Sequence, residues 1–361
     1  MDKVIAIIML VFALIGAIDR IIGNKLGLGK EFEKGFLLLG PIVLSMLGML
    51  ILAPVIANLL SPVFTFAYNV LKMEPSIIPT MLLANDMGGA PLATEIAKDP
   101  KLGMYNAMVV SSMMGATISF TIPFALGCVK KERQRELILG LLCGVVTIPV
   151  GCLIAGIISK IPFVSLILNL LPLIIFAAIV AVCLLLFPNA CIKIFGVVGV
   201  IIKTVITIGL ALGIIELLIG VKLVEGTGDV TEGAMICLKA VVVMSGAFPL
   251  LALLSKVLSK PMKKLGDVIG INEKSMLGFL STLATNMPTF GMMDEMDKKG
   301  TVLNSAFAVS AAFVLAGHLA FTLAFEPSYL VPVMVGKITA GLSAIAFAFV
   351  VYKKVGNKIE K

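Results

Sequence analysis

Long apolar runs alternate with short polar segments along most of this chain. Most runs are about 20 residues long, which lets a helix cross roughly 30 Å of hydrocarbon. The sequence lacks the period-two alternation of membrane β-strands, so helices are the remaining way to satisfy the backbone in lipid. We therefore predict nine membrane-spanning helices, at 4–22, 36–60, 105–127, 137–158, 163–187, 195–220, 235–258, 302–325 and 330–352.

Two further apolar stretches, 76–97 and 276–296, carry polar residues in the middle and are interrupted by glycine or proline. The first contains the string LLANDMGGAP at 82–91, with the carboxylate of Asp86, and the second contains the similar string LATNMPT at 283–289. Polar side chains, glycine and proline at membrane depth are costly unless they face a cavity. The two interruptions therefore predict the solute pathway of a transporter.

Composition indicates the same class of protein. Hydrophobic residues make up 59% of the 361 positions, charged residues only 14%, and the mean hydropathy is +1.11. A water-soluble domain of this length could not bury so much apolar surface, so we predict an integral protein of the lipid bilayer. The net charge of +8 comes from lysine and arginine in short loops, which is typical of cytoplasmic loops and not of nucleic-acid binding.

Loop charge bears on whether the two interrupted stretches cross the membrane. If both cross, the basic loop 130–135 lies on the opposite side from 20–34, and the acidic loop 225–232 is cytoplasmic. If instead each stretch returns to the face of the membrane from which it enters, the acidic loop 225–232 lies outside. The basic segments are then all cytoplasmic: 20–34, 130–135, 256–274 and 353–361. The positive-inside rule favours the second arrangement, which has two re-entrant hairpins, an outside N-terminus and an inside C-terminus.

Similar strings recur in the two halves of the chain beyond the interrupted stretches. Segment 16–23 parallels 213–220, and 120–122 parallels 321–323. We predict a first transmembrane repeat, a linking helix and a second repeat, at 1–160, 161–190 and 191–361. Because four crossings and one linker precede the second repeat, it is inverted relative to the first. The predicted fold is an all-α polytopic membrane protein with the inverted repeats of a secondary transporter.

Asp86 is the first candidate for substrate binding. A lone carboxylate at membrane depth costs several kcal/mol unless it is paired or hydrated, and an anionic site favours a cationic or proton-carrying substrate. The alternative is structural: Asn85 or Asp86 caps backbone donors where the chain reverses at Gly88 and Gly89. One residue can serve both purposes, so the two interpretations stay open.

Asn286 occupies the position of Asp86 in the second half of the chain. Its amide offers donors and an acceptor, which suits a hydroxyl or an ammonium group. An asparagine at a hairpin tip beside Pro288 can instead bond its own backbone. Thr285 pairs with Asn85 in the same alignment, so both join Asp86 and Asn286 as candidate substrate-binding residues.

His318 is the single histidine of the chain and lies inside the predicted span 302–325. The repeat alignment pairs it with Thr117, and we include both in the candidate site. An imidazole can relay a proton near neutral pH; the alternative is a neutral buried histidine bonded to a carbonyl. Lys203 and Lys337 also fall within predicted spans, and we expect their ammonium groups to snorkel to the membrane surface.

Other chemistries find no support in the sequence. The six cysteines have neither metal-ligand spacing nor a C-x-x-C motif, and we expect them to be reduced small hydrophobes. No nucleophile–base set, phosphate-binding loop or dinucleotide fingerprint is present. We therefore predict that the protein is not an enzyme and has no metal, no cofactor and no nucleic-acid partner.

Several motifs are spread over nearly the whole chain. They are FEKGF at 32–36, ANDMGG at 84–89, SMMG at 112–115, TIP at 147–149, FGMM at 290–293, FAVSAAF at 307–313 and GHL at 317–319. Together they resemble the EutH family of bacterial ethanolamine-utilisation proteins. The resemblance implies a multi-pass inner-membrane protein that helps ethanolamine enter the cell, where a cobalamin-dependent lyase degrades it inside a microcompartment.

The resemblance implies a substrate but does not identify which residues bind it. Ethanolamine carries an alkylammonium group that stays protonated at neutral pH, so Asp86 would meet the ammonium, and Asn286 and Thr285 the hydroxyl. Cation–π contacts would come from phenylalanine or tyrosine, because the chain has no tryptophan. Open alternatives are a channel, a carrier of another small polar amine or nucleoside, and a membrane scaffold. Coupling to H⁺ or Na⁺ and assembly as a homo-oligomer also stay open.

Overall fold

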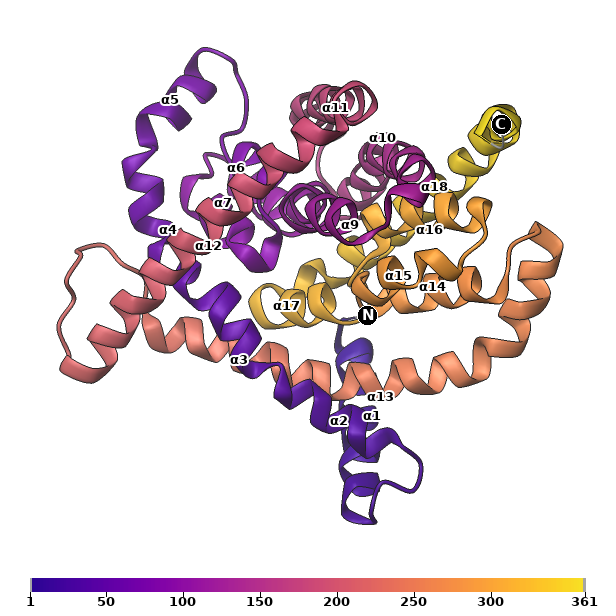
Figure 1. The fold of residues 1–361 in the computed structure, drawn as a ribbon. Coiled ribbons are helices and arrows are strands. Elements are labelled where there is room, and N and C mark those ends of the chain that lie inside the picture. The colour runs from indigo at the N-terminus through magenta and orange to yellow at the C-terminus, as the bar shows by residue number, and fades with distance from the viewer. Residues whose placement is uncertain (1, 360–361) are drawn as a thin grey trace.

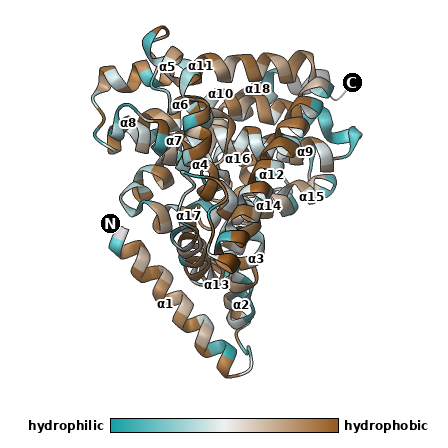
Figure 2. Ribbon diagram, turned by 90° about the vertical axis from the view of Figure 1, so that its left-hand side faces the viewer, coloured by the Kyte–Doolittle hydropathy of each residue, from teal (hydrophilic) through white to brown (hydrophobic). Residues whose placement is uncertain are grey.

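The computed structural model describes residues 2–359, and over that range the chain is helical and contains no strand (Figure 1). Eight described segments are long and apolar enough to cross a membrane: Lys3–Ile21, Leu28–Leu59, Pro100–Cys128, Lys131–Ile158, Phe163–Leu186, Pro188–Ile219, Val230–Leu258 and Pro327–Lys354. Figure 2 shows hydrophobic residues along these helices and hydrophilic residues gathered mainly in loops and at helix ends. The prediction of a polytopic α-helical membrane protein is confirmed.

Six of the spans are built on one long helix each: α1 (Asp2–Ile21), α10 (Gln134–Ile158), α11 (Phe163–Leu186), α12 (Pro188–Ile219), α13 (Val230–Ile269) and α18 (Leu330–Ile359). Two spans consist of consecutive pieces: α2 (Leu28–Leu37), α3 (Leu39–Ile42), η1 (Val43–Leu47) and α4 (Gly48–Leu59), and then α8 (Pro100–Tyr105), η3 (Asn106–Gly115), η4 (Thr117–Thr121) and α9 (Ile122–Cys128). Shorter elements connect them: α5 (Ser61–Asn69), η5 (Lys131–Arg133) and η7 (Pro327–Tyr329).

The predicted span 302–325 is not one continuous helix, which corrects our expectation of nine such spans. It is divided into α16 (Lys298–Ala311) and α17 (Gly317–Phe325), and Phe313 between them has a left-handed backbone with φ 66°. A helix can break at membrane depth only where its freed backbone groups find partners. Here the N–H of Phe313 donates to Thr282 O (3.2 Å) and that of Leu315 to Leu283 O (2.9 Å).

The two interrupted stretches form pairs of short helices. Hairpin 1 comprises α6 (Ile77–Leu82), η2 (Asn85–Met87) and α7 (Gly89–Ile96); hairpin 2 comprises α14 (Glu273–Ala284), α15 (Met287–Gly291) and η6 (Met293–Glu295). In each hairpin the two α-helices contact each other. The longest of these helices, α14, has 12 residues and is about 18 Å long, well short of the roughly 30 Å of hydrocarbon.

Side-chain caps begin the helices that follow the hairpins and several others. Asp99 accepts from Lys101 N (2.8 Å) at the start of α8, and Asp297 accepts from Gly300 N (3.0 Å) at the start of α16. Asp229 caps α13 in the same manner. Each carboxylate satisfies backbone donors that have no partner inside the first helical turn.

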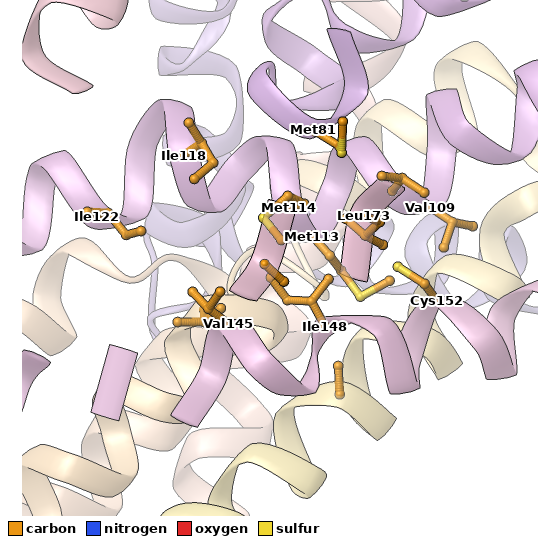
Figure 3. Packing of buried hydrophobic residues seen from close by; sticks show 14 of the residues in the cluster. Met81, Val109, Met113, Met114, Ile118, Ile122, Val145, Ile148, Cys152 and Leu173 are labelled. Atoms are coloured by element: carbon orange, nitrogen blue, oxygen red, sulfur yellow. The ribbon is translucent and has the colours of Figure 1, made fainter. Parts of the chain in front are cut away.

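The segment 100–128 is the centre of the molecule. In its most apolar part 78% of the residues are buried within the chain, against 17% for α1, so most of α1 is left uncovered by the rest of the chain. Most of this central segment is π-helical, in η3 and η4. Figure 3 shows Met113 and Met114 of η3 packed with Ile148 and Cys152 of α10 and with Leu173 of α11.

The remaining helices pack around this centre in two groups. α13 contacts α1 and α2, and α12 contacts α4, whereas α10, α16 and α18 pack on one another. In Figure 1, α13 runs along one side of the molecule beside α1 and α2. Both hairpins are held between these groups, where they meet the central segment and the break between α16 and α17.

Polar contacts hold the two ends of hairpin 1 close to the loops that contain Lys160 and Tyr329. The carboxylate of Glu74 accepts from the backbone N–H groups of Lys98 (3.0 Å) and Asp99 (3.1 Å). The ammonium of Lys101 donates to Lys160 O, and the hydroxyl of Tyr329 donates to Lys101 O (3.4 Å). Hairpin 1 therefore starts and ends at the same end of the molecule as residues 160 and 329.

The base of hairpin 2 lies with a different loop. Lys130 pairs with Asp294 at 2.7 Å, and Arg133 donates to Met296 O at 2.8 Å. The hydrogen bond from Lys130 to Asp294 raises the pKa of Lys130 above its ordinary value. α10 connects residues 130–135 to residue 160, and its 25 residues separate the two hairpin bases by about 37 Å.

Gly115 permits the close approach of hairpin 1 to the central segment. A Cβ there would overlap Leu83 O and lie 2.7 Å from Thr80 O. We predict that Gly115→Ala costs about 1–3 kcal/mol of stability, because backbone atoms cannot move aside as a flexible side chain can. Gly127→Ala is the matched control, since nothing lies within 4 Å of its Cβ position. Equal thermal unfolding midpoints for the two purified variants would contradict the prediction.

Candidate substrate site

The tip of hairpin 1 delivers Asp86 to the centre of the molecule. α6 ends at Leu82, the chain is extended at Leu83 and Ala84, and Gly88 takes the left-handed conformation (φ 106°) from which α7 begins. Two hydroxyls hold the extended part: Ser111 Oγ donates to Leu83 O (2.5 Å), and Ser119 Oγ accepts from Ala84 N (3.2 Å). These contacts replace the helical hydrogen bonds that the reversal removes.

Asp86 faces His318 across the break between α16 and α17. His318 Nε2 lies 4.0 Å from Asp86 Oδ1. The two side chains differ in environment, because 31% of the Asp86 side chain is accessible and only 3% of the His318 side chain. His318 Nδ1 has no hydrogen-bond partner among the described residues. The carboxylate is thus accessible from a cavity whose wall contains the imidazole.

Asp86 lines two cavities. The first, which we name the Asp86 cavity, has a volume of about 290 Å³. It is lined by Pro41, Ser45, Ala84, Asp86, Met87, Ala116, Phe120, Met287, Phe313 and His318. The second, which we name the adjoining cavity, measures about 540 Å³ and shares Asp86, Ser45 and Phe313 with the first. It extends to Glu31 and Lys34 on α2 and to Ser255 on α13.

Two aromatic rings stand beside the carboxylate in the Asp86 cavity. The rings of Phe120 and Phe313 meet edge to face, with centroids 5.6 Å apart, and Phe313 lies 5.0 Å from the imidazole of His318. A carboxylate and aromatic rings in the wall of a mostly apolar cavity suit a small organic ammonium ion, because charge pairing and cation–π attraction can both favour it there.

The tip of hairpin 2 reaches the other side of the central segment. Asn286 Nδ2 donates to Thr121 Oγ1 at 3.0 Å, and Asn286 is fully buried. Its neighbour Thr285 lines the adjoining cavity together with Asp86. Each hairpin tip thus meets a helix of the other half of the chain: Asp86 approaches His318 to 4.0 Å, and Asn286 bonds Thr121.

Two further candidates lie behind the cavity walls. Asn85 is fully buried and neither of its amide atoms has a hydrogen-bond partner among the described residues. Thr117 Oγ1 bonds the carbonyls of Met113 (2.6 Å) and Val309 (2.9 Å), which joins η4 to α16. Of the six candidates, the structure brings Asp86 and His318 together in one cavity and Thr285 into the next; Asn85, Asn286 and Thr117 do not line either cavity.

The model of one protein family, described as "Ethanolamine utilisation protein, EutH", matches residues 1–351. The chain belongs to the EutH family. A protein of Listeria monocytogenes named "Probable ethanolamine permease EutH" is 42% identical over 357 residues, which cover 99% of this chain and 96% of that protein. A Salmonella typhimurium protein of the same name is 37% identical over 391 residues, covering 98% and 96%.

A third relative in the same comparison is the Bacillus subtilis "Uncharacterized protein YxeR", 36% identical over 347 residues, which cover 96% of this chain and 94% of that protein. No solved structure matches the chain. The resemblance found in the sequence motifs is thus confirmed at the level of the family.

Three residues at or near the candidate substrate site of this EutH protein were not among the six candidates chosen from the sequence. Phe120 and Phe313 gave no signal beyond their apolar character, although the need for a cation–π partner pointed to phenylalanine or tyrosine. Lys337 was expected to snorkel, and this expectation is wrong: the residue is only 1% exposed, and its Nζ donates to Ser112 O at 2.6 Å. The other lysine within a span, Lys203, is exposed on α12, and its snorkelling stays a prediction.

Metal binding finds no support in the described part of the chain. Among those residues no group of three or more His, Cys, Asp or Glu side chains could hold a metal ion, and all six cysteines are free. The polar side chains that line the Asp86 cavity are Asp86, His318 and Ser45, in an otherwise apolar and partly aromatic wall.

The bond between Asn286 and Thr121 gives a testable prediction. Among the described residues Thr121 is the one hydrogen-bond partner of the fully buried Asn286 amide, so Thr121→Val should cost about 1–3 kcal/mol of stability. Thr322→Val is the matched control, because that buried hydroxyl bonds only a carbonyl of its own helix, His318 O (2.7 Å). Thermal unfolding in detergent measures both, and a control as unstable as Thr121→Val would refute the tertiary role of this bond.

Proposed function

We propose that this EutH protein is a carrier that brings ethanolamine across the bacterial cytoplasmic membrane. The observation that supports it most is the accessible carboxylate of Asp86 beside Phe120 and Phe313 in a cavity at a broken helix. The relatives named "Probable ethanolamine permease EutH" favour the same substrate.

The chemistry of ethanolamine fits these residues. Its ammonium group stays protonated at neutral pH, as a lysine does, and loses hydration on entering the cavity. A charge-assisted hydrogen bond to Asp86 and the aromatic faces compensate for that loss. The hydroxyl end has donors and acceptors in Ser45, in the imidazole of His318 and, from the adjoining cavity, in Thr285.

Contacts in the two halves of the chain support the inverted repeat. Asp99 and Asp297 cap equivalent helices after the hairpins. Asn106 Nδ2 reaches Ser76 Oγ (2.9 Å) at the base of hairpin 1, and Asn304 Nδ2 reaches Ser275 O (2.8 Å) at the base of hairpin 2. These equivalences favour repeats at 1–160 and 191–361 related by inversion.

The positions of the hairpin bases support re-entrant hairpins that enter from opposite faces. The base of hairpin 2 lies with the basic loop 130–135, which the positive-inside rule assigns to the cytoplasm. The base of hairpin 1 lies at the other end of α10. Helices as short as those of the hairpins can stay at membrane depth because protein and cavities surround their tips.

Separate cavities on the two sides of hairpin 1 favour a carrier over a channel. The adjoining cavity leads from Asp86 to Glu31 and Lys34, in the predicted cytoplasmic region. A cavity of about 210 Å³ on the other side contains Glu95 and Asp229 and shares no lining residue with the two Asp86-lined cavities. Access from one side at a time is the requirement for alternating access, and we infer that this conformation gives access to Asp86 from the predicted cytoplasmic side.

Asp86→Asn tests the binding role of the carboxylate. We expect uptake of labelled ethanolamine into proteoliposomes to fall at least about tenfold, because the amide is neutral and loses the charge-assisted bond. Asp267→Asn, at an exposed carboxylate near the end of α13, should transport normally. Undiminished uptake by Asp86→Asn would assign Asp86 to hairpin capping, and absence of saturable uptake in the wild type would refute the proposed function.

Phe120→Leu tests the aromatic wall. Loss of a cation–π contact should raise KM for ethanolamine by about two- to thirtyfold while the maximal rate changes little, since leucine keeps the apolar packing. Phe66→Leu, on an exposed ring of α5, is the matched control. A change confined to the maximal rate would show that Phe120 acts on the conformational step and does not bind the ammonium.

A further inference from the structure

Lys337 is a buried cation that the binding of substrate does not use. It lies on α18, within a segment apolar enough to cross the membrane, yet it is only 1% exposed. A lysine in such a position normally extends toward water. Here its Nζ donates to Ser112 O (2.6 Å), a backbone carbonyl of the π-helical η3. One carbonyl dipole compensates for a buried charge only partly, so an opposite charge is required nearby.

Asp86 provides that opposite charge. The hydrogen bond of Lys337 to Ser112 O lies next to Ser111, whose hydroxyl holds Leu83 at the tip of hairpin 1, so the ammonium of Lys337 is close enough to Asp86 for an electrostatic interaction. The other titratable neighbours of Lys337 are His318 and Cys152. Of these groups Asp86 alone is an acid that is ionised when free in water near pH 7. With His318 neutral, the charges of Asp86 and Lys337 cancel when no substrate is bound. When ethanolammonium binds, the site carries one net positive charge.

We propose that Lys337 is the built-in counter-cation of Asp86, which allows the unloaded carrier to return across the membrane without a bound coupling ion. This inference rests on the proposed function. A carrier that has released its substrate must move a carboxylate through a region of low dielectric, where an uncompensated charge is costly. In an ion-coupled carrier a bound cation would neutralise that carboxylate. In this protein the side chain on α18 takes the place of that cation.

Two consequences follow for wild-type transport. Uptake does not require Na⁺, because no site for a coupling cation has to be filled. The loaded carrier moves one positive charge and the unloaded carrier none, so an inside-negative membrane potential accelerates uptake. Proteoliposomes with a potassium diffusion potential, in buffers with Na⁺ replaced by N-methylglucamine, measure both. A strict requirement for Na⁺ would overturn the proposal.

Variants of Lys337 separate this role from a structural one. In Lys337→Met the loaded site is neutral, whereas the unloaded site keeps an uncompensated carboxylate. We expect net uptake, which needs return of the unloaded carrier, to fall at least about tenfold. Counterflow exchange, in which the carrier is loaded in both directions, should stay within about twofold of the wild type. Lys337→Gln, which keeps a donor for Ser112 O, should behave in the same manner.

Controls make each outcome decisive. Lys203→Met removes an exposed lysine from α12 and should leave both transport modes unchanged. Size-exclusion profiles verify folding, and Lys337→Gln replaces Lys337→Met if the latter does not insert. Equal loss of net uptake and counterflow in a folded variant, or no loss of either, would overturn the role of Lys337. A wild type without ethanolamine counterflow would instead refute the proposed function.

Discussion

The cost of a carboxylate at membrane depth governs the organisation of this protein. Asp86 cannot stay ionised in hydrocarbon without a positive partner or access to water, and the structure supplies a cavity, an adjacent imidazole and a buried lysine. To hold Asp86 there, hairpin 1 must reverse in the core, and its backbone must be satisfied at the reversal. The hydroxyls of Ser111 and Ser119 meet this second requirement.

The same constraint explains the unusual helices around the site. α16 and α17 are separated where they face Asp86, and the freed N–H groups of Phe313 and Leu315 bond to carbonyls of α14. In the first half of the chain the equivalent segment stays continuous as the π-helices η3 and η4. Each irregular backbone segment is packed against a hairpin, so none of its polar groups has to face lipid.

The sequence predicted the class of fold well. Apolar runs of membrane-crossing length are a local property, and eight of the nine predicted spans match helices of the structure. The prediction of one continuous helix at 302–325 was wrong. The backbone partners of Phe313 and Leu315 lie about thirty residues away in sequence, and hydrophobic periodicity carries no information on such pairing. Asp86 and His318 were chosen as lone polar groups in apolar surroundings, which the pattern itself reveals.

The sequence alone determined that this is a helical membrane protein of the EutH type with polar interruptions in both halves. The length of the apolar runs, their hydropathy and the motifs are all local properties of the sequence. Only the tertiary structure decided which polar side chains reach a cavity. Asn85 and Thr117 turned inward, whereas Phe120 lines the wall, and Lys337 is enclosed instead of snorkelling. The reason is physical: the direction and partners of a side chain depend on helices that pack together from distant parts of the sequence.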